Sequence, residues 1–351
     1  MTSPVRGPLP RPDYASLTRY TPDRRPVPVD LSDNTNLWGT HPAALEAIRS
    51  AGTDALARYP HLYADDLRAA VASLHGVTPE HVATGCGSDD VLDSLWRALA
   101  EDGGAVSYAA PTFSMVEPLS RMNGREARAV AWSRALADPG LLLEGDPVMV
   151  YVCRPNNPTG HQAPEAWVTE LLRRVGDEGP VLLIDEAYAD FAGDTLIPTA
   201  VAHPRALVVR TLSKAYGLAG LRVGYAVGSE ALVSEVEKSR GPYKVNRLAE
   251  VAACAALADE DGWVRRTIAE CIENRERLVA ALRSRGEAPL PSASNFVLLP
   301  VAAGAAVPTA LALRERGVAI RPFPDCIDVG DAVRVTVGPW PLMEKFLQAW
   351  D

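Results

Sequence analysis

The chain has 351 residues, of which 47% are hydrophobic and 23% charged, so it can bury a large core and is too apolar to be disordered in bulk. Its 44 acidic and 35 basic residues give a net charge of −9, which argues against a nucleic-acid partner because such proteins present a basic face to the phosphates. The five cysteines include no C-x-x-C pair, so we expect reduced thiols rather than a disulfide framework or a zinc site.

The first 30 residues are rich in proline, arginine and aspartate and show no hydrophobic periodicity, so we expect an arm rather than a domain. This segment lacks the apolar core of a signal peptide. The longest apolar runs of the chain, such as residues 148–153 and 181–184, have the length of strands. We therefore expect a cytoplasmic protein without membrane insertion.

Short apolar runs alternate with amphipathic helical stretches between residue 31 and residue 246. Helical periodicity occurs at residues 43–52, 64–76 and 89–100, and strand-sized runs occur at residues 105–110, 147–153, 181–187, 206–211 and 221–228. Strands separated by helices are typical of βαβ units. The sequence therefore predicts an α/β domain with a mostly parallel sheet.

The pattern changes after Arg247. Residues 248–286 form a long helical run, and short strands at residues 295–300 and 332–338 flank a further helix. This pattern predicts a smaller α+β domain. The expected division is an arm at residues 1–30, a large domain at residues 31–246 and a small domain at residues 247–351. Roughly the first 15 residues of the large domain are expected to pack with the small domain.

An acid ends the predicted buried strand at residues 181–185. Ligands bind at the C-terminal edge of parallel sheets, so Asp185 is a candidate site residue. A strand-end acid can also cap a helix or hold Mg²⁺ beside a nucleotide. The nucleotide alternative is disfavoured because the sequence contains no G-x-x-x-x-G-K loop.

Lys214 follows the next predicted strand in apolar, glycine-rich surroundings. Removal from water would lower the pKa of this lysine toward that of a nucleophilic amine. Arg222 lies between Gly220 and Gly224, which let the backbone come close to a ligand. From these residues alone, the alternative is a lysine at a helix start with a partnered arginine.

Two further motifs present polar groups in rigid settings. The segment R-P-N-N-P-T-G, from Arg154 to Gly160, predicts a turn that fixes the orientation of Asn157. The segment G-C-G-S-D-D, from Gly85 to Asp90, opens a predicted helix with small and capping residues. Free N–H groups at such a helix start suit a phosphate.

Five motifs in chain order resemble those of the fold-type I pyridoxal-phosphate (PLP) aminotransferases, and most closely the histidinol-phosphate aminotransferase subgroup. They are the anion-binding G-C-G-S-D-D, the aromatic in P-T-F-S-M, N-N-P-T-G, D-E-A-Y and S-K-A-Y-G-L-A-G-L-R-V-G. The resemblance extends from about Tyr20 to Gly338. It implies an α/β fold with a mostly parallel seven-stranded sheet between helices and a smaller α+β domain. It also implies PLP as the cofactor and a homodimer with shared active sites.

The resemblance implies a role for each residue around the cofactor. Lys214 is expected to form the Schiff base with PLP and to move the proton, and Asp185 to pair with the pyridine nitrogen. Tyr188, the third expected catalytic residue, would hydrogen-bond the ring oxygen together with Asn157, and Phe113 would stack on the ring. The phosphate is expected to be held by Ser88, Asp89, Ser213, Arg222 and, from the neighbouring subunit, Tyr59.

The resemblance also implies substrate contacts. Arg334 matches an arginine that grips the substrate's α-carboxylate with its planar fork, which lysine would not replace. Arg321 lies at a second strand end, where it could instead shape the side-chain pocket. Tyr20 matches a tyrosine that contacts a distal substrate phosphate, and Asn36 is also assigned to the substrate.

Two departures from the family pattern bear on specificity. The family usually reads N-E-N-P where this chain reads N-T-N-L-W at residues 34–38, so Thr35 replaces an acid and Trp38 adds an indole. The usual G-N-G contains Cys86 here. In the family the acid lies near the substrate side chain. We therefore expect the chemistry to be retained and the specificity to differ.

The implied activity is ping-pong transfer of an amino group between a 2-oxo acid and a donor, which is a histidinol-phosphate-like amino-alcohol phosphate or an aromatic or specialised amino acid. The alternative is a decarboxylase of the threonine-phosphate type, or another PLP lyase or oxidase, which breaks a different bond at Cα. A cofactor-binding regulator is disfavoured because Lys214, Asp185 and Arg222 are all retained. The histidines show no H-x-x-x-H spacing, so no metal site is expected.

Overall fold

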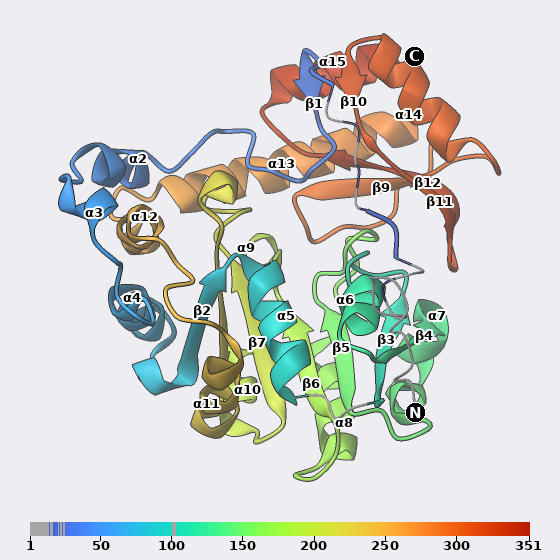
Figure 1. Ribbon diagram of the computed structural model, residues 1–351. Coiled ribbons are helices and arrows are strands. Elements are labelled where there is room, and N and C mark those ends of the chain that lie inside the picture. The colour runs from blue at the N-terminus through green and yellow to red at the C-terminus, as the bar shows by residue number, and fades with distance from the viewer. Residues whose placement is uncertain (1–13, 15–16, 20, 22, 24, 100–102) are drawn as a thin grey trace, which may run out of the picture.

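The computed structural model describes residues 14, 17–19, 21, 23, 25–99 and 103–351. Within these residues the strands form one sheet of seven strands, one of three and one of two. Figure 1 shows the large sheet between layers of helices, with the three-stranded sheet and its helices on one side of it.

The large sheet is mostly parallel, as the sequence predicts. Only β8 runs antiparallel to its neighbours among the described pairings, and β3, β5, β6 and β7 are buried along their whole length. Continuous burial fits a sheet covered on both faces. The strand order is β2 (Val82–Cys86), β8 (Val223–Gly228), β7 (Ala206–Thr211), β6 (Val181–Asp185), β5 (Met149–Cys153), β3 (Ala105–Ala110) and β4 (Glu126–Ala131).

Alternate residues of each strand belong to two cores, one on each face of the sheet. In β6, Leu182 and Ile184 pack in the first core, whereas Leu183 packs in the second core on the opposite face of the sheet. The second core is covered by α5 (Ser88–Leu99), α6 (Val116–Met122) and α11 (Glu230–Ser239). In α5 the apolar residues recur at helical spacing, so one face of the helix is buried.

The first core is covered by helices from both halves of the chain. The helices that contribute to it include α4 (Asp65–His75), α8 (Glu165–Val175), α10 (Ile197–Ala202) and α12 (Arg247–Ala258). Further helices are α2 (Pro42–Arg49), α3 (Asp54–Ala57), α7 (Trp132–Ala137) and α9 (Ala189–Ala192), with 3₁₀ turns at Pro79–His81, Pro139–Leu143 and Ala219–Leu221.

The three-stranded sheet is antiparallel and has the order β11 (Arg321–Cys326), β12 (Gly330–Thr336) and β9 (Phe296–Pro300). The helices α13 (Trp263–Ser284), α14 (Ala306–Glu315) and α15 (Trp340–Trp350) accompany it, and the long α13 extends toward α2 and α12 (Figure 1). In the two-stranded sheet β1 (Val29–Asp30) pairs with β10 (Val318–Ala319). The division into domains at residues 30 and 246 stays a prediction.

Residues 31–40 connect the small sheet to the loop that carries Lys214. Leu31 accepts a backbone hydrogen bond from Thr336 at the end of β12 (2.9 Å). Farther along, Asn36 donates its side-chain amide to the carbonyl of Ala215 (2.9 Å). These bonds bring β12, this segment and the Lys214 loop to one place.

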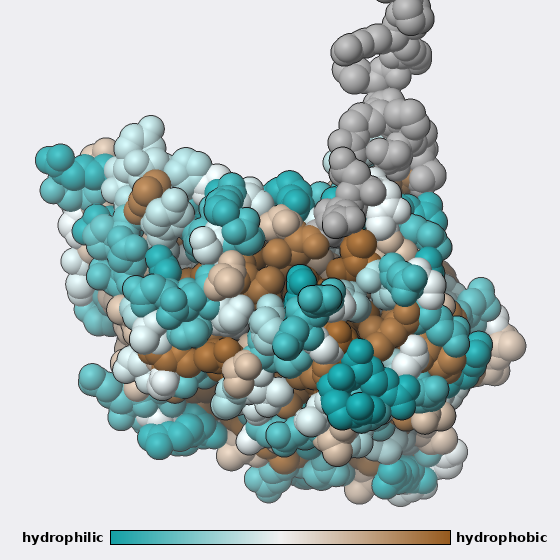
Figure 2. Space-filling view, turned by 90° about the horizontal axis from the view of Figure 1, so that it is seen from below, coloured by the Kyte–Doolittle hydropathy of each residue, from teal (hydrophilic) through white to brown (hydrophobic). Residues whose placement is uncertain are grey.

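Within the part of the chain that the structure describes, every helix is too short or too polar to span a bilayer. The face in Figure 2 is largely polar, with apolar side chains gathered in patches between the polar ones.

Candidate active site

The C-terminal ends of β5, β6 and β7 open onto a cavity of about 590 Å³. Their last residues, Cys153, Asp185 and Thr211, all line it. This is the sheet edge at which ligands bind in α/β folds. The residues expected from the sequence that line the cavity are Ser88, Asp89, Phe113, Asn157, Asp185, Tyr188, Ser213, Lys214, Arg222, Arg321 and Arg334.

Asp185 is a buried carboxyl group with a hydrogen bond to each oxygen. The Tyr151 hydroxyl donates to Oδ2 (2.6 Å), and the Ala187 backbone N–H donates to Oδ1 (3.0 Å). Burial raises the pKa of Asp185 to about 6, although both hydrogen bonds act to lower it. The two hydrogen bonds favour the ionised carboxylate against the effect of burial, and this charged form is the one that binds a protonated nitrogen.

The sequence did not point to Tyr151, although a signal was present. Cys153 is the register partner of Asp185 on the neighbouring strand. Side chains alternate along a strand, so Tyr151, two residues earlier, lies on the same face as Cys153 and Asp185. Knowledge of the register would have placed the hydroxyl beside the carboxylate.

Lys214 extends from the loop after β7 into the cavity. Its Nζ donates to the backbone carbonyl of Asp33 (3.1 Å) and lies 5.8 Å from the centre of the Tyr188 ring. Burial, followed by the positive charge of Arg334, lowers the pKa of Lys214 to about 8. A lowered pKa gives a larger share of neutral, nucleophilic amine.

The start of α5 forms an anion-binding cup with Arg222. Ser88 is the first residue of α5, and Ser88 and Asp89 both line the cavity. The free N–H groups of the first helical turn therefore lie at the cavity. The Arg222 guanidinium donates to Ser213 Oγ (3.4 Å) and to Asp89 Oδ2 (3.2 Å). The pair with Asp89 is half exposed, so it holds Arg222 weakly and leaves it able to turn toward an anion.

Asn157 and Tyr188 are expected to bind the ring oxygen of the cofactor, and each of them accepts a hydrogen bond from a neighbouring side chain. Asn157 accepts a hydrogen bond through Oδ1 from the Arg334 guanidinium. The Tyr188 hydroxyl accepts one from the Asn34 side-chain amide (3.0 Å), and burial raises the pKa of Tyr188 to about 12. Phe113 lines the cavity as well. Their contacts with a cofactor stay predictions, and Asn34, far away in sequence, was not anticipated.

Arg334 is 5% exposed and is held by aromatic rings and neutral oxygens. Its guanidinium carbon lies 5.3 Å from the centres of both the Phe296 and Phe323 rings. Its Nη2 donates to the carbonyl of Ser32 (2.8 Å). The planar fork is thus fixed in orientation at the cavity wall, as carboxylate recognition requires.

Arg321 is the register partner of Arg334 on the neighbouring antiparallel strand. Its Nη2 lies 3.2 Å from Oδ1 of Asp33, and both side chains are about four-fifths buried. Asp33 also lines the cavity, which gives this end of the site one carboxylate beside two arginines. Sequence analysis did not single out Asp33.

Two described residues assigned from the resemblance, Tyr59 and Asn36, do not line this cavity. Tyr59 is 79% exposed and stacks on Tyr243, with ring centres 4.8 Å apart. Asn36 holds the Lys214 loop through the carbonyl of Ala215. Tyr20 lies outside the described residues.

The departures from the family pattern also fall in different places. Thr35 lines the cavity. Trp38 is partly buried and packs against the first core, and Cys86 is exposed. Of these three residues, Thr35 is the one in contact with the cavity space.

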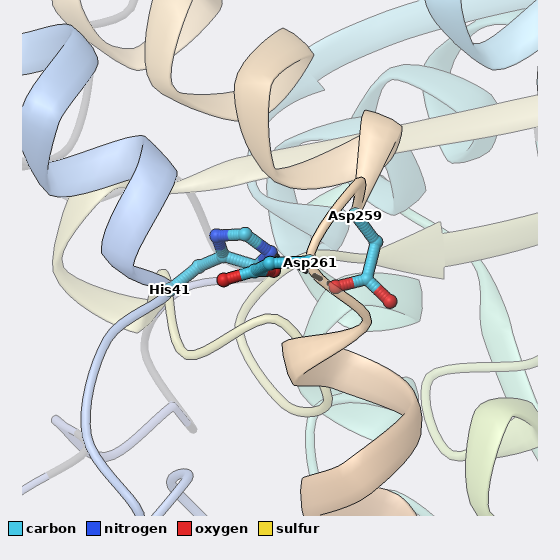
Figure 3. A group of neighbouring side chains, drawn as sticks. All are labelled: His41, Asp259 and Asp261. Atoms are coloured by element: carbon cyan, nitrogen blue, oxygen red, sulfur yellow. Dashed lines mark hydrogen bonds and ion pairs between the residues drawn. The ribbon is translucent and has the colours of Figure 1, made fainter.

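A group of possible metal ligands lies at the contact of α2 with the α12–α13 turn. The buried His41 ring lies beside Asp259 and Asp261 (Figure 3). Its Nε2 is 3.1 Å from Asp259 Oδ1, and its Nδ1 accepts from the Ala43 backbone N–H (3.2 Å). Because both ring nitrogens of His41 have polar partners within the chain, this group of side chains connects α2 to the α12–α13 turn.

The residues present fit the pyridoxal phosphate that the resemblance implies. A Cβ on Gly224 would lie 2.3 Å from the backbone nitrogen of Ser88, and one on Gly87 would lie 2.4 Å from Nη2 of Arg222. Glycine at these two positions therefore lets β8 and the Arg222 guanidinium come close to the start of α5, where the cup lies. At the other end, the buried Asp185 and the pKa-lowered Lys214 supply the carboxylate and the amine that such a ring requires.

The chain is similar to known proteins over most of its length. A family model described as aminotransferase class I and II matches residues 26–349. Histidinol-phosphate aminotransferase 2 of Thiobacillus denitrificans is 37% identical over 332 residues, 92% of this chain and 91% of the relative. An aromatic amino acid aminotransferase of Thermobifida fusca is 37% identical over 335 residues, 92% of this chain and 91% of the relative. The crystal structure of histidinol-phosphate aminotransferase from Sinorhizobium meliloti in complex with pyridoxal-5'-phosphate matches with a TM-score of 0.83 at 26% identity, covering 93% of this chain and 90% of that one.

Proposed function

The chain belongs to the aminotransferase class I and II family and is a PLP-dependent aminotransferase, and we propose that its amino donor is an amino acid whose α-carboxylate binds Arg334. The observation that carries this proposal is the fixed guanidinium of Arg334 on the wall of the cavity that also holds Lys214 and Asp185. The amino acceptor is a 2-oxo acid, which presents the same carboxylate to the same arginine.

The proposed roles follow from the geometry of the side chains. Pyridoxal phosphate, when bound, supplies an electron sink for the negative charge that develops at the substrate Cα. Lys214 takes up and returns a proton at Nζ, which its lowered pKa permits. Asp185 holds the proton on the ring nitrogen, and Arg334 orients the substrate through its carboxylate. Arg222 and the start of α5 hold the phosphate.

The ion pair between Asp33 and Arg321 supports an amino acid over an amino-alcohol phosphate as the donor. A phosphate ester carries close to two negative charges, and near Arg321 it would also approach the Asp33 carboxylate. A single carboxylate on Arg334 avoids that repulsion. The aromatic amino acid aminotransferase relative is as similar to this chain as the histidinol-phosphate relative.

A donor screen tests this proposal. The purified enzyme is mixed with single aromatic amino acids or with histidinol phosphate. The 2-oxo acid from the amino acid, the phosphorylated ketone from histidinol phosphate, and any CO₂ are measured. We expect an aromatic amino acid to be the better donor. In Asp33→Asn we expect kcat/KM for histidinol phosphate to rise about tenfold, with little change for amino acids. A wild-type preference for histidinol phosphate, or an unchanged ratio in the variant, would contradict the assignment.

Decarboxylation is the alternative at this site. A carboxylate gripped by Arg334 is retained rather than released, which supports transamination. The comparisons give the alternative no better support. CO₂ release equal to the amine consumed in the donor screen would favour the decarboxylase.

We also propose a homodimer in which Tyr59 reaches the phosphate site of the partner. The exposed stack of Tyr59 on Tyr243, with Leu56 and Leu62 exposed close by in the sequence, supports this proposal. An exposed group of large apolar side chains is typical of a protein interface. A cytoplasmic location is part of the same proposal, and the five free cysteines are consistent with it.

Hybrid dimers test the role of Tyr59. Mixing Lys214→Ala chains with Tyr59→Phe chains gives hybrids in which one site carries both changes and the other carries neither. We expect the mixture to regain activity above either parent. Mixing Lys214→Ala with Asp185→Asn is the control, because both changes affect each chain's own site and no intact site forms. Equal activity of the two mixtures would show that Tyr59 does not act across the interface.

A further inference from the structure

The hydroxyl of Tyr151 lies against the carboxylate that is assigned to the cofactor ring. Tyr151 is fully buried in the middle of β5, and its hydroxyl oxygen is 2.6 Å from Oδ2 of Asp185. The Trp96 ring packs beside it with ring centres 6.0 Å apart. The phenol is therefore held between the sheet and α5, with its polar end directed at one oxygen of Asp185.

The two oxygens of Asp185 have different kinds of donor. Oδ1 accepts from the backbone N–H of Ala187, which follows from the local turn after β6. Oδ2 accepts from a side chain of another strand, so this second bond depends on the residue at position 151. A hydrogen bond to an ionised carboxylate favours the charged form over the neutral one.

Tyr151 remains a donor over the whole working range of pH. Burial, with the nearby charge of Asp185, raises the pKa of Tyr151 well above its ordinary value. The phenol therefore does not become an anion that would compete with Asp185. The other titratable groups facing Asp185 are Cys153 on β5, Asp89 on α5, Lys214 after β7 and Tyr188 after β6.

We propose that Tyr151 is a positioning residue that keeps Asp185 ionised and fixes the plane of its carboxylate, so that the shared proton stays on the ring nitrogen of the cofactor. This inference rests on the proposed role of Asp185. Without the hydroxyl, Oδ2 would lose this partner in an apolar, buried setting, and the carboxyl would compete for the proton. The cofactor would then be a weaker electron sink although all of its direct contacts remain.

The direct test measures the protonation of Asp185 in the cofactor-free protein. The infrared band of the protonated carboxyl group is followed against pH and assigned by its loss in Asp185→Asn. In Tyr151→Phe we expect the midpoint to rise by about one to two pH units, the size expected for one hydrogen bond to a charged group. The matched control is Tyr225→Phe, because Tyr225 is also buried, and its hydroxyl bonds His75 (3.0 Å) in the opposite core.

A second variant keeps the test valid if Tyr151→Phe folds poorly. Site-specific replacement of Tyr151 by 3-fluorotyrosine retains the shape and makes the hydroxyl a stronger donor, so the midpoint should fall instead of rise. In the holoenzyme, the acid limb of the single-turnover rate should move in the same direction as the midpoint in each variant. Unchanged midpoints in both variants would overturn the proposal. This readout needs neither cofactor nor substrate, so it can fail or succeed independently of the proposed amino donor.

Discussion

Gly87→Ala tests the phosphate cup without removing any functional side chain. Gly87 has φ +83°, and an added Cβ would lie 2.4 Å from Nη2 and 2.9 Å from Cζ of Arg222. The guanidinium is the far end of a flexible, half-exposed side chain, so it can turn outward instead of breaking the fold. The substitution should therefore displace Arg222 from the position where it faces the phosphate.

The size of the effect follows from what Arg222 supplies. A hydrogen bond to a charged group contributes about 1.5–3 kcal/mol. Because each 1.4 kcal/mol is about a factor of ten, the dissociation constant for PLP should rise about 10- to 150-fold. The positive φ adds a strain of about 1 kcal/mol, which acts on the free energy of unfolding rather than on cofactor affinity.

The assay is equilibrium dialysis of the cofactor-free protein against PLP, with urea unfolding of the same samples. Gly76→Ala is the control for strain, because Gly76 has φ +66° and no atom within 4 Å of the added Cβ. Gly220→Ala is the control for a substitution in the Arg222 loop without a clash. The reasoning is refuted if Gly87→Ala binds PLP within twofold of the wild type, or if Gly76→Ala weakens binding equally.

Two further predictions concern the cationic side chains of the cavity. Arg334→Lys should raise KM for the amino acid at least tenfold with little loss of bound PLP, because a lysine cannot reproduce the two parallel hydrogen bonds of a guanidinium. Steady-state kinetics measure KM, and the absorbance of the cofactor measures the PLP content. An unchanged KM would show that Arg334 does not bind the carboxylate. In the cofactor-free protein, the folded pKa of Lys214 is lowered from 10.5 to about 8, so the unfolded chain binds the extra proton between these values. The free energy of unfolding should therefore rise by about 3 kcal/mol as the pH rises from about 8 to 10.5. Urea unfolding of Lys214→Met should lack this contribution. An equal rise in the variant would show that Lys214 does not have the lowered pKa.

The sequence predicted those parts of the site that follow strands directly. Asp185 ends a continuous apolar run and Lys214 lies three residues after another, so the α/β rule alone places both at one sheet edge. Arg222 and the α5 cup follow from glycine and capping patterns in the same way. The seven-stranded, mostly parallel sheet was also anticipated, through the family resemblance, and is confirmed.

The contacts that tune these residues could not be predicted, because they join segments far apart in the chain. The Asn34 amide reaches the hydroxyl of Tyr188 across 154 residues of sequence, and Asp33 reaches Arg321 across 288. Tyr151 lies closer, but its contact with Asp185 depends on the register of two strands. Local patterns carry no information on such pairings until the strands are aligned.

A single-turnover measurement on the holoenzyme tests the central claim most directly. The enzyme is mixed with one amino acid donor without an acceptor, and the 2-oxo acid, the CO₂ and the amine form of the cofactor are measured. We predict one 2-oxo acid and one amine-form cofactor per active site, no CO₂ in the wild type, and no reaction in Lys214→Ala. Failure of every amino acid to yield a 2-oxo acid, or an equal yield from Lys214→Ala, would contradict the account.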